Sequence, residues 1–128
     1  MRRALLILLL LVSTAPLVRA GDVIAHESVT LNADEVRDVF LGEKQLAGGI
    51  RLVPVDNRAA QTEFLAKILQ TDSQKYYARW TRKTFREGLP APSIKGSDAE
   101  VVAFVKATPG AIGYVRQRVP GVKVLQGF

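Results

Sequence analysis

Apolar residues recur at intervals of three and four along four segments of the chain, the spacing that gathers them on one face of an α-helix. Asn32 and Glu35 open the first segment as a capping box, and Gly42 can take the left-handed conformation that ends it. Two further capping-box patterns, Thr71–Gln74 and Ser97–Glu100, open the third and fourth segments. The pattern therefore predicts helices over residues 32–42, 59–69, 71–87 and 97–108.

Short apolar or β-branched runs between these helices have the length of buried strands. The predicted strands lie within residues 22–28, 50–55, 111–115 and 122–125, while Gly88–Gly96 contains Pro90 and Pro92 and is predicted as a loop. Strands that alternate with helices predict an α/β fold with a central mixed sheet flanked by helices. The expected core comprises Phe40, Val53, Phe64, Ile68, Trp80, Phe104, Val105, Ile112 and Val115. The third helix is expected to face that core with Tyr76, Tyr77, Trp80 and Phe85.

The first twenty residues have the pattern of a cleaved export signal. Two arginines precede the apolar run Ala4–Val12, and the segment ends in Val18-Arg19-Ala20, whose first and third residues suit signal peptidase. A membrane anchor is the alternative, but this run has about half of the roughly 20 apolar residues that spanning a bilayer requires. We expect cleavage after Ala20, one mature domain over residues 21–128 and a periplasmic location.

Removal of the leader changes the charge of the protein. The whole chain has 18 basic and 12 acidic residues and a formal net charge of +6, but loss of Arg2, Arg3 and Arg19 lowers the charge to +3. A charge this small on an exported protein does not favour a nucleic-acid partner.

The absence of cysteine excludes disulfides, thiolate metal sites and cysteine nucleophiles.

Three segments of the chain carry a resemblance to a known family. They are Asp34–Gly42, Val53–Ile68 and Asp98–Val115, and the last of them ends in the sequence TPGAIGYV. In this order they resemble the periplasmic phosphate-binding proteins of ABC transporters, which have the two-lobed type II solute-binding fold. In that family a helix followed by such a sequence closes one lobe; here Pro-Gly ends the helix, and Gly113 lets a neighbouring backbone approach the strand. The resemblance implies a single lobe, as in short stand-alone members, and a link to phosphate transport.

The resemblance also implies an oxyanion site where the second predicted strand enters its helix. In the family, an Arg and a Ser-Gly-Thr loop hold phosphate at a helix N-terminus there. This chain has Asp56–Thr62 at that place, without the Ser-Gly-Thr sequence and with the negative charge of Asp56 close by. The residues assigned to this candidate site for phosphate or a related oxyanion are Ser28, Asn57, Arg58, Gln61 and Thr62.

A basic stripe on the third helix is a second candidate site. Lys75, Arg79, Arg82 and Arg86 stand at positions i, i+4, i+7 and i+11, which places them on one helical face, with Lys83 beside them. Two interpretations remain open. The stripe is either a solvated face opposite the apolar side of the helix or a surface that attracts an acidic partner or an anionic membrane.

No pattern in the chain points to catalysis, a metal or a cofactor. His26 is the only histidine and has no neighbours at metal-ligand spacing, while the pair Asp34 and Asp38 is explained by the capped first turn of a helix. We therefore expect a non-enzymatic binding or interaction module, without a cofactor, that contacts an envelope protein such as a transporter or a sensor. The alternative is a periplasmic binding protein for phosphate or a related oxyanion that completes its cleft as a homodimer.

Overall fold

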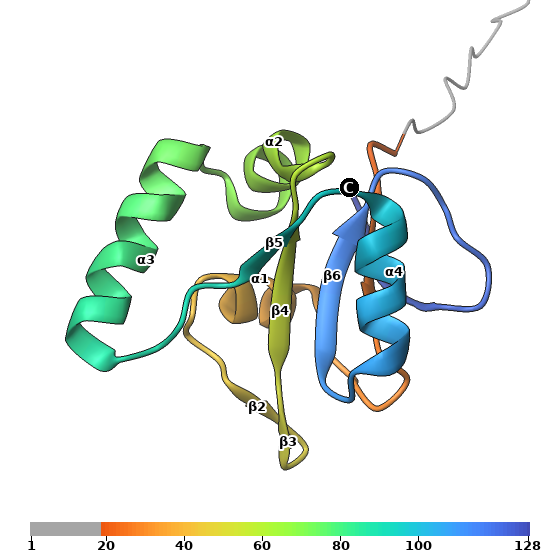
Figure 1. Cartoon of the computed structure of the whole chain (residues 1–128), viewed down its shortest axis with the longest axis horizontal. Helices are drawn as coiled ribbons and strands as arrows, with labels where there is room; N and C mark the ends of the chain where they lie inside the picture. The colour runs from red at the N-terminus through yellow and green to blue at the C-terminus, as the bar shows by residue number, and fades with distance from the viewer. Residues whose placement is uncertain (1–18) are drawn as a thin grey trace, which may run out of the picture.

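A computed structural model of the protein describes residues 19–128 (Figure 1). The predicted leader therefore lies outside the described residues except for its last two positions. The helices are α1 (Ala33–Phe40), α2 (Gln61–Phe64), which continues as the π-helix η1 (Leu65–Leu69), α3 (Ser73–Glu87) and α4 (Asp98–Ala107). The strands are β1 (Asp22–Ala25), β2 (Leu46–Ala47), β3 (Ile50–Arg51), β4 (Val53–Asn57), β5 (Ser93–Lys95), β6 (Ala111–Val115) and β7 (Lys123–Gly127).

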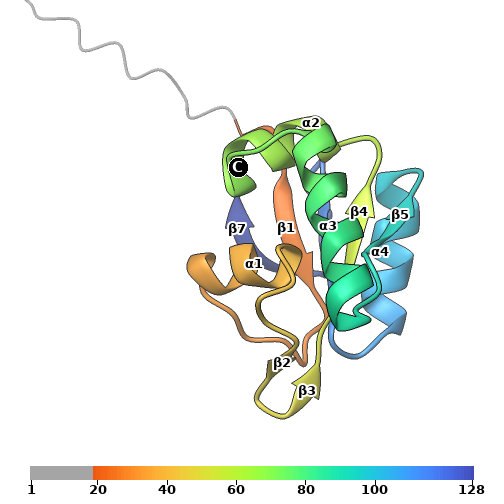
Figure 2. The ribbon, with the colours of Figure 1, turned by 90° about the vertical axis from the view of Figure 1, so that its left-hand side faces the viewer.

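Five strands form one mixed sheet in the order β5-β4-β6-β1-β7, and β2 and β3 form a separate hairpin. The strands β5, β4 and β6 run parallel to one another, whereas β1 runs antiparallel to both of its neighbours, β6 and β7. Figure 2 shows the β2–β3 hairpin at the opposite end of the molecule from α2. The expected α/β fold with a central mixed sheet flanked by helices is confirmed.

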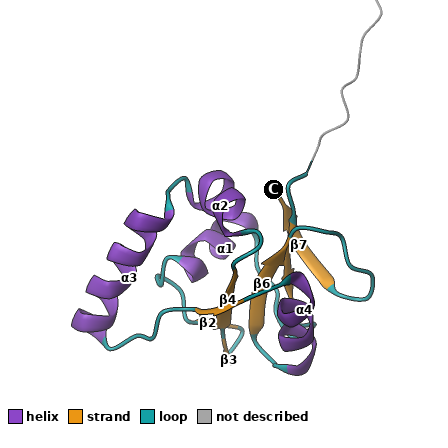
Figure 3. Cartoon of the chain, turned by 45° about the horizontal axis from the view of Figure 1, so that its top comes forward, coloured by secondary structure: helices purple, strands orange, loops and turns teal. Residues whose placement is uncertain are grey.

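Each face of the sheet is covered by helices, because both faces of its central strands are apolar. Figure 3 shows α4 on one side of the sheet and α1, α2 and α3 on the other. Alternate residues of β6 serve the two sides: Ile112 and Tyr114 join the larger core under the three helices, while Ala111 and Val115 join the smaller core under α4. Within residues 19–128, no helix is long and apolar enough to cross a lipid bilayer.

The close packing of α4 on the sheet depends on Gly113. A Cβ atom at this position would lie 2.7 Å from Val101 Cγ1 and 3.1 Å from Val55 Cγ2, closer than such atoms can approach without movement. The prediction of a close neighbour at this glycine is thus correct in kind, but the nearest atoms belong to side chains of α4 and β4 rather than to a backbone.

Several element boundaries differ from those that the sequence predicts. The strand predicted over residues 50–55 is divided into β3 and β4, and the Gly88–Gly96 loop contains the edge strand β5. The cap of α3 is Asp72, whose side chain accepts a hydrogen bond from the backbone N–H of Lys75, and not Thr71. The capping box of α1 at Asn32 forms as predicted.

Two of the four aromatic residues predicted to face the core from α3 do not do so. Tyr76 and Trp80 are buried, but Tyr77 is 45% exposed and Phe85 is 91% exposed. The reason is helical geometry, since Phe85 lies five positions after Trp80 and therefore about 140° away around the helix. Of the predicted core residues, Val53, Ile68 and Phe104 are only half-buried, and the other six are buried.

Candidate functional site

Asn57, the last residue of β4, organises the junction where an oxyanion site is expected. Its side chain is fully buried, and its Nδ2 donates to Asp98 Oδ1 (2.7 Å) and to the carbonyl oxygen of Tyr114 (3.0 Å). Its Oδ1 accepts a hydrogen bond from the backbone N–H of Ala59 at 3.0 Å. Because both amide hydrogens are already engaged within the protein, Asn57 shapes the loop and has no donor left for a ligand.

Asp98 is the second polar centre at this end of the sheet. Besides Asn57, its carboxylate accepts hydrogen bonds from the backbone N–H groups of Arg116, at 3.1 Å to each oxygen, and of Gln117, at 3.0 Å. These bonds tie the loop after β6 to the first turn of α4, which an acidic residue also favours electrostatically. These hydrogen bonds therefore link β4, α4 and the loop after β6, and they use only groups of the protein itself.

The remaining junction residues differ in their accessibility. The Gln61 amide exchanges hydrogen bonds with the Tyr77 hydroxyl, at 2.9 Å from Nε2 and 3.1 Å from Oε1, and so fastens α2 to α3. Arg58 and Thr62 are exposed. The backbone N–H of Arg58 donates to the carbonyl oxygen of Lys95 at 2.9 Å, which fixes the main chain and leaves the guanidinium in solvent. Arg58 and Thr62 are therefore the junction side chains that an anion could reach.

Ser28 does not lie with the other four residues of the predicted oxyanion site. It follows β1, and its Oγ accepts a hydrogen bond from the backbone N–H of Gly110 at 3.1 Å and lies 2.7 Å from His26 Nδ1. Because β1 runs antiparallel to β6 while β4 runs parallel to it, the segment after β1 and the segment after β4 lie at opposite ends of the sheet. The expectation that Ser28 and Asn57 share one site is therefore corrected.

A buried hydrogen-bonding network around Asp56 is a feature that the sequence pattern does not predict. This carboxylate is 1% exposed, and it accepts hydrogen bonds from the hydroxyls of Tyr114 (2.8 Å) and Tyr76 (2.9 Å). Burial raises the pKa of Asp56 to about 6, although the two tyrosine hydrogen bonds act in the opposite direction. Burial, and then the Asp56 charge, raises the pKa of both tyrosines. Solvent therefore hardly reaches this carboxylate, and its hydrogen bonds link β4 to α3 and β6.

The basic residues of the α3 stripe differ in whether they pair with acidic residues of the protein. Arg79 pairs with Glu43 at 2.6 Å, and the ammonium of Lys83 lies 3.5 Å from the same carboxylate. Lys75 lies 4.0 Å from Asp72, the cap of its own helix. In the part of the chain that the structure describes, Arg82 and Arg86 form no ion pair and are exposed. The outward positive charge is therefore concentrated in the second half of α3.

An aromatic side chain lies next to these two arginines. Phe85 stands three residues after Arg82 and one before Arg86, and it is the most exposed large apolar side chain in residues 19–128. On its other side, α3 is anchored by Tyr76 and by Trp80, whose indole N–H donates to the carbonyl oxygen of Phe40 at 3.0 Å. The helix thus presents Arg82, Phe85 and Arg86, here called the outer α3 face, on a fixed support.

The described residues contain no cluster of potential metal ligands. No three His, Asp or Glu side chains of residues 19–128 come together in a way that could hold a metal ion. Comparison of the sequence with protein-family models and with curated proteins gives no match, so the resemblance to phosphate-binding proteins bears on function only as a proposal.

Proposed function

We propose that this chain is an exported, non-enzymatic interaction module, built like one lobe of a phosphate-transport binding protein, that docks onto an acidic surface of an envelope protein through the outer α3 face. The observation that carries the proposal is the exposure of Phe85, at 91%, between two arginines that have no ion-pair partner in the described residues. A transporter or a sensor in the envelope is the expected class of partner.

The composition of the outer α3 face supports an interface. A single exposed apolar residue is common on protein surfaces. Aromatic residues and arginine, however, are the types enriched where binding energy is concentrated, and here both occur on one helix turn. Arg82 and Arg86 would attract an acidic surface, and Phe85 would bury its ring in the complex. The ordered attachment of α3 through Tyr76 and Trp80 limits the entropy lost on binding.

Site-specific crosslinking in the native envelope tests this proposal. A photoreactive phenylalanine at position 85 is expected to give one discrete adduct with an envelope protein, whereas the same group at the exposed position Thr62 is expected to give none. With the identified partner purified, Phe85→Ala should weaken binding about 30-fold or more, the effect of losing an interface hot spot. Replacing Arg82 and Arg86 by alanine should weaken binding and reduce its salt dependence, while Arg58→Ala should leave both unchanged.

Two outcomes would count against the proposal. Equal crosslinking from positions 85 and 62 would show that the outer α3 face has no preferred partner. Binding of the protein to vesicles with anionic lipids, lost in the Arg82 and Arg86 double variant and without any protein adduct, would assign the face to a membrane surface instead.

Oxyanion binding at the junction is the second candidate function, since Arg58 and Thr62 remain accessible there. We expect the isolated monomer to bind phosphate weakly, because Ala60, the N-cap residue of α2, provides no side-chain cap, Asn57 is fully engaged, and the described residues 19–128 leave the junction open to solvent at Arg58 and Thr62. A solvent-exposed helix terminus contributes only about 0.3–1 kcal/mol, whereas millimolar affinity requires about 4 kcal/mol.

Calorimetric titration with phosphate and sulfate measures this affinity, with Arg58→Ala as the comparison and the oligomeric state determined in the same buffer. Any residual binding should fall in Arg58→Ala. Submicromolar binding by a demonstrated monomer would contradict the prediction and favour the solute-binding function. Tight binding confined to a dimer would support the alternative of a cleft completed by a homodimer.

A further inference from the structure

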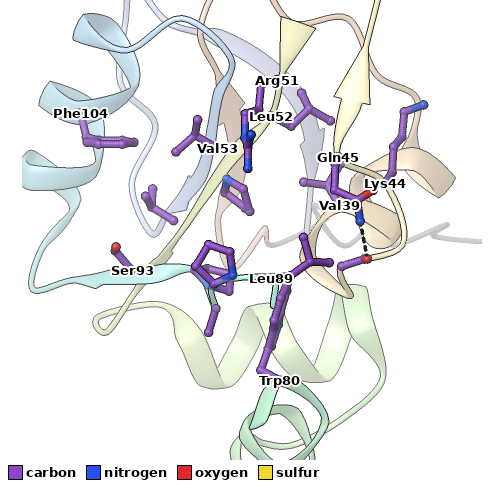
Figure 4. A pocket seen from close by; sticks show the side chains of 16 residues that line it. Val39, Lys44, Gln45, Arg51, Leu52, Val53, Trp80, Leu89, Ser93 and Phe104 are labelled. Carbon is purple, nitrogen blue, oxygen red and sulfur yellow. Dashed lines mark hydrogen bonds between the residues drawn. The ribbon is translucent and has the colours of Figure 1, made fainter. Parts of the chain in front are cut away.

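A cleft of about 220 Å³ opens between β4 and the segment Leu89–Ser93, which connects α3 to β5 (Figure 4). It lies at the amino-terminal half of β4, so it is separate from the junction after that strand, and it does not include the residues of the outer α3 face. Its floor is formed by side chains that are themselves buried and come from different parts of the chain: Val39, Leu52, Val55 and Trp80.

The walls of the cleft are also apolar and are stiff. Leu89, Pro90 and Pro92 form one wall, and Val53 and Phe104 contribute to the other. Prolines restrict the backbone of the connecting segment, and the floor residues belong to packed elements, so the cleft does not depend on a movement of the chain to form. Water in such a space has few hydrogen-bonding partners, and its displacement by an apolar group is favourable.

Polar groups of the cleft are few, and most are engaged. The ammonium of Lys44 lies 3.3 Å from the Glu35 carboxylate, and Gln45 Nε2 donates to the carbonyl oxygen of Gly42 at 2.8 Å, the bond drawn in Figure 4. Arg51 also lines the cleft, and its side chain has no ion pair or hydrogen bond among the described residues. The cleft therefore combines an apolar interior with one guanidinium that is available to an anion.

We propose that this cleft binds a single aromatic ring that carries a carboxylate on a short chain. A dry apolar cavity of about 150 Å³ is known to accommodate benzene, so a volume of about 220 Å³ accommodates a ring together with a short substituent. Trp80 lies in the floor, where it contributes to the apolar lining, and Arg51 offers a planar fork of N–H donors that matches a carboxylate. The occupant is thus a small aryl-alkyl carboxylate.

Trp80 provides the measurement, because it is the only tryptophan of the chain and lies in the floor of the cleft. Titration with 3-phenylpropionate is expected to change the tryptophan emission in a saturable manner. The neutral 3-phenylpropanamide should bind about fivefold more weakly, the effect of one exposed ion pair, and butyrate should cause no change. Arg51→Gln should remove the difference between the acid and the amide, while Arg58→Gln, at the other end of β4, should preserve it.

The size of the cleft and the source of the ligand are tested separately. Val53→Phe places a ring in the cleft and should abolish the binding of both the acid and the amide. Peptides that end in a free Phe carboxylate, compared with their amidated forms, show whether the site takes a protein terminus or a small molecule. The proposal is overturned if 3-phenylpropionate gives no saturable change up to about 10 mM, if acid and amide bind equally to the unmodified protein, or if Arg58→Gln has the same effect as Arg51→Gln.

Discussion

Phe64→Ala is expected to lower the free energy of unfolding by about 3–5 kcal/mol, the range for truncation of a buried phenylalanine. Phe64 is fully buried, and its ring stacks on Tyr114 with the ring centroids 3.9 Å apart and the planes at 10°. The rings of Phe40 and Phe128 meet it edge to face, with centroids at 4.8 Å and 5.7 Å. Removal of the central ring would leave a cavity surrounded by three aromatic residues that are fixed by their own packing.

Phe85→Ala is the matched control for this prediction. The chemical change is identical, but Phe85 is 91% exposed, so the free energy of unfolding should change by no more than about 0.5 kcal/mol. Urea unfolding of the two variants and the unmodified protein, followed by circular dichroism, measures both values. A similar loss of stability in both variants would contradict the placement of these rings, and a small loss in Phe64→Ala alone would mean that the aromatic cluster can collapse around the cavity.

The parts of the fold that the sequence predicts correctly depend on local interactions. The α1 cap requires only Asn32 and Glu35, three residues apart, and the end of α4 requires only the Pro-Gly sequence that precedes β6. Strand β6 has the predicted bounds, because it is apolar throughout and is buried on both faces. Each of these signals lies within a few neighbouring residues, so no knowledge of the tertiary structure is needed to interpret them.

The incorrect predictions have two causes. Most concern features that only the tertiary structure determines, and one results from assigning a residue to the wrong face of a helix. Strand β5 is short and mostly exposed, and its pairing with β4 cannot be recognised from a segment rich in proline. The separation of Ser28 from Asn57 depends on the direction of β1, which sequence periodicity does not reveal. The exposure of Phe85, in contrast, could have been predicted, because a residue five positions after Trp80 does not share its face of a helix.

The network around Asp56 has a consequence for the pH dependence of stability. The pKa of its carboxyl group is about 6 in the folded protein, above the ordinary value of 3.8 that applies in the unfolded chain, so between these pH values the folded state binds more protons. The stability associated with the protonated form is fully present below about pH 4 and is lost as the pH rises through about 6. Because Asp56 is almost completely buried, this pKa difference corresponds to a loss of about 3 kcal/mol in the free energy of unfolding between acidic and neutral pH.

Asp56→Asn is therefore expected to have little effect on stability near pH 4 and to stabilise the protein by up to about 3 kcal/mol near pH 7.5. The asparagine side chain resembles the protonated carboxyl group, since it accepts from one tyrosine hydroxyl and donates to the other, but it carries no charge at any of these pH values. The measurement is the difference in unfolding free energy between the variant and the unmodified protein across this pH range. Taking the difference cancels the titration of the other carboxylates, such as that of Glu35, whose pKa is lowered by a hydrogen bond from the Asn32 backbone N–H.

Asp38→Asn, on an exposed position of α1, is the control, and its stability should follow a pH curve parallel to that of the unmodified protein. A parallel curve for Asp56→Asn as well would mean that the buried carboxylate titrates near its ordinary pKa and that the two tyrosine hydroxyls compensate its burial.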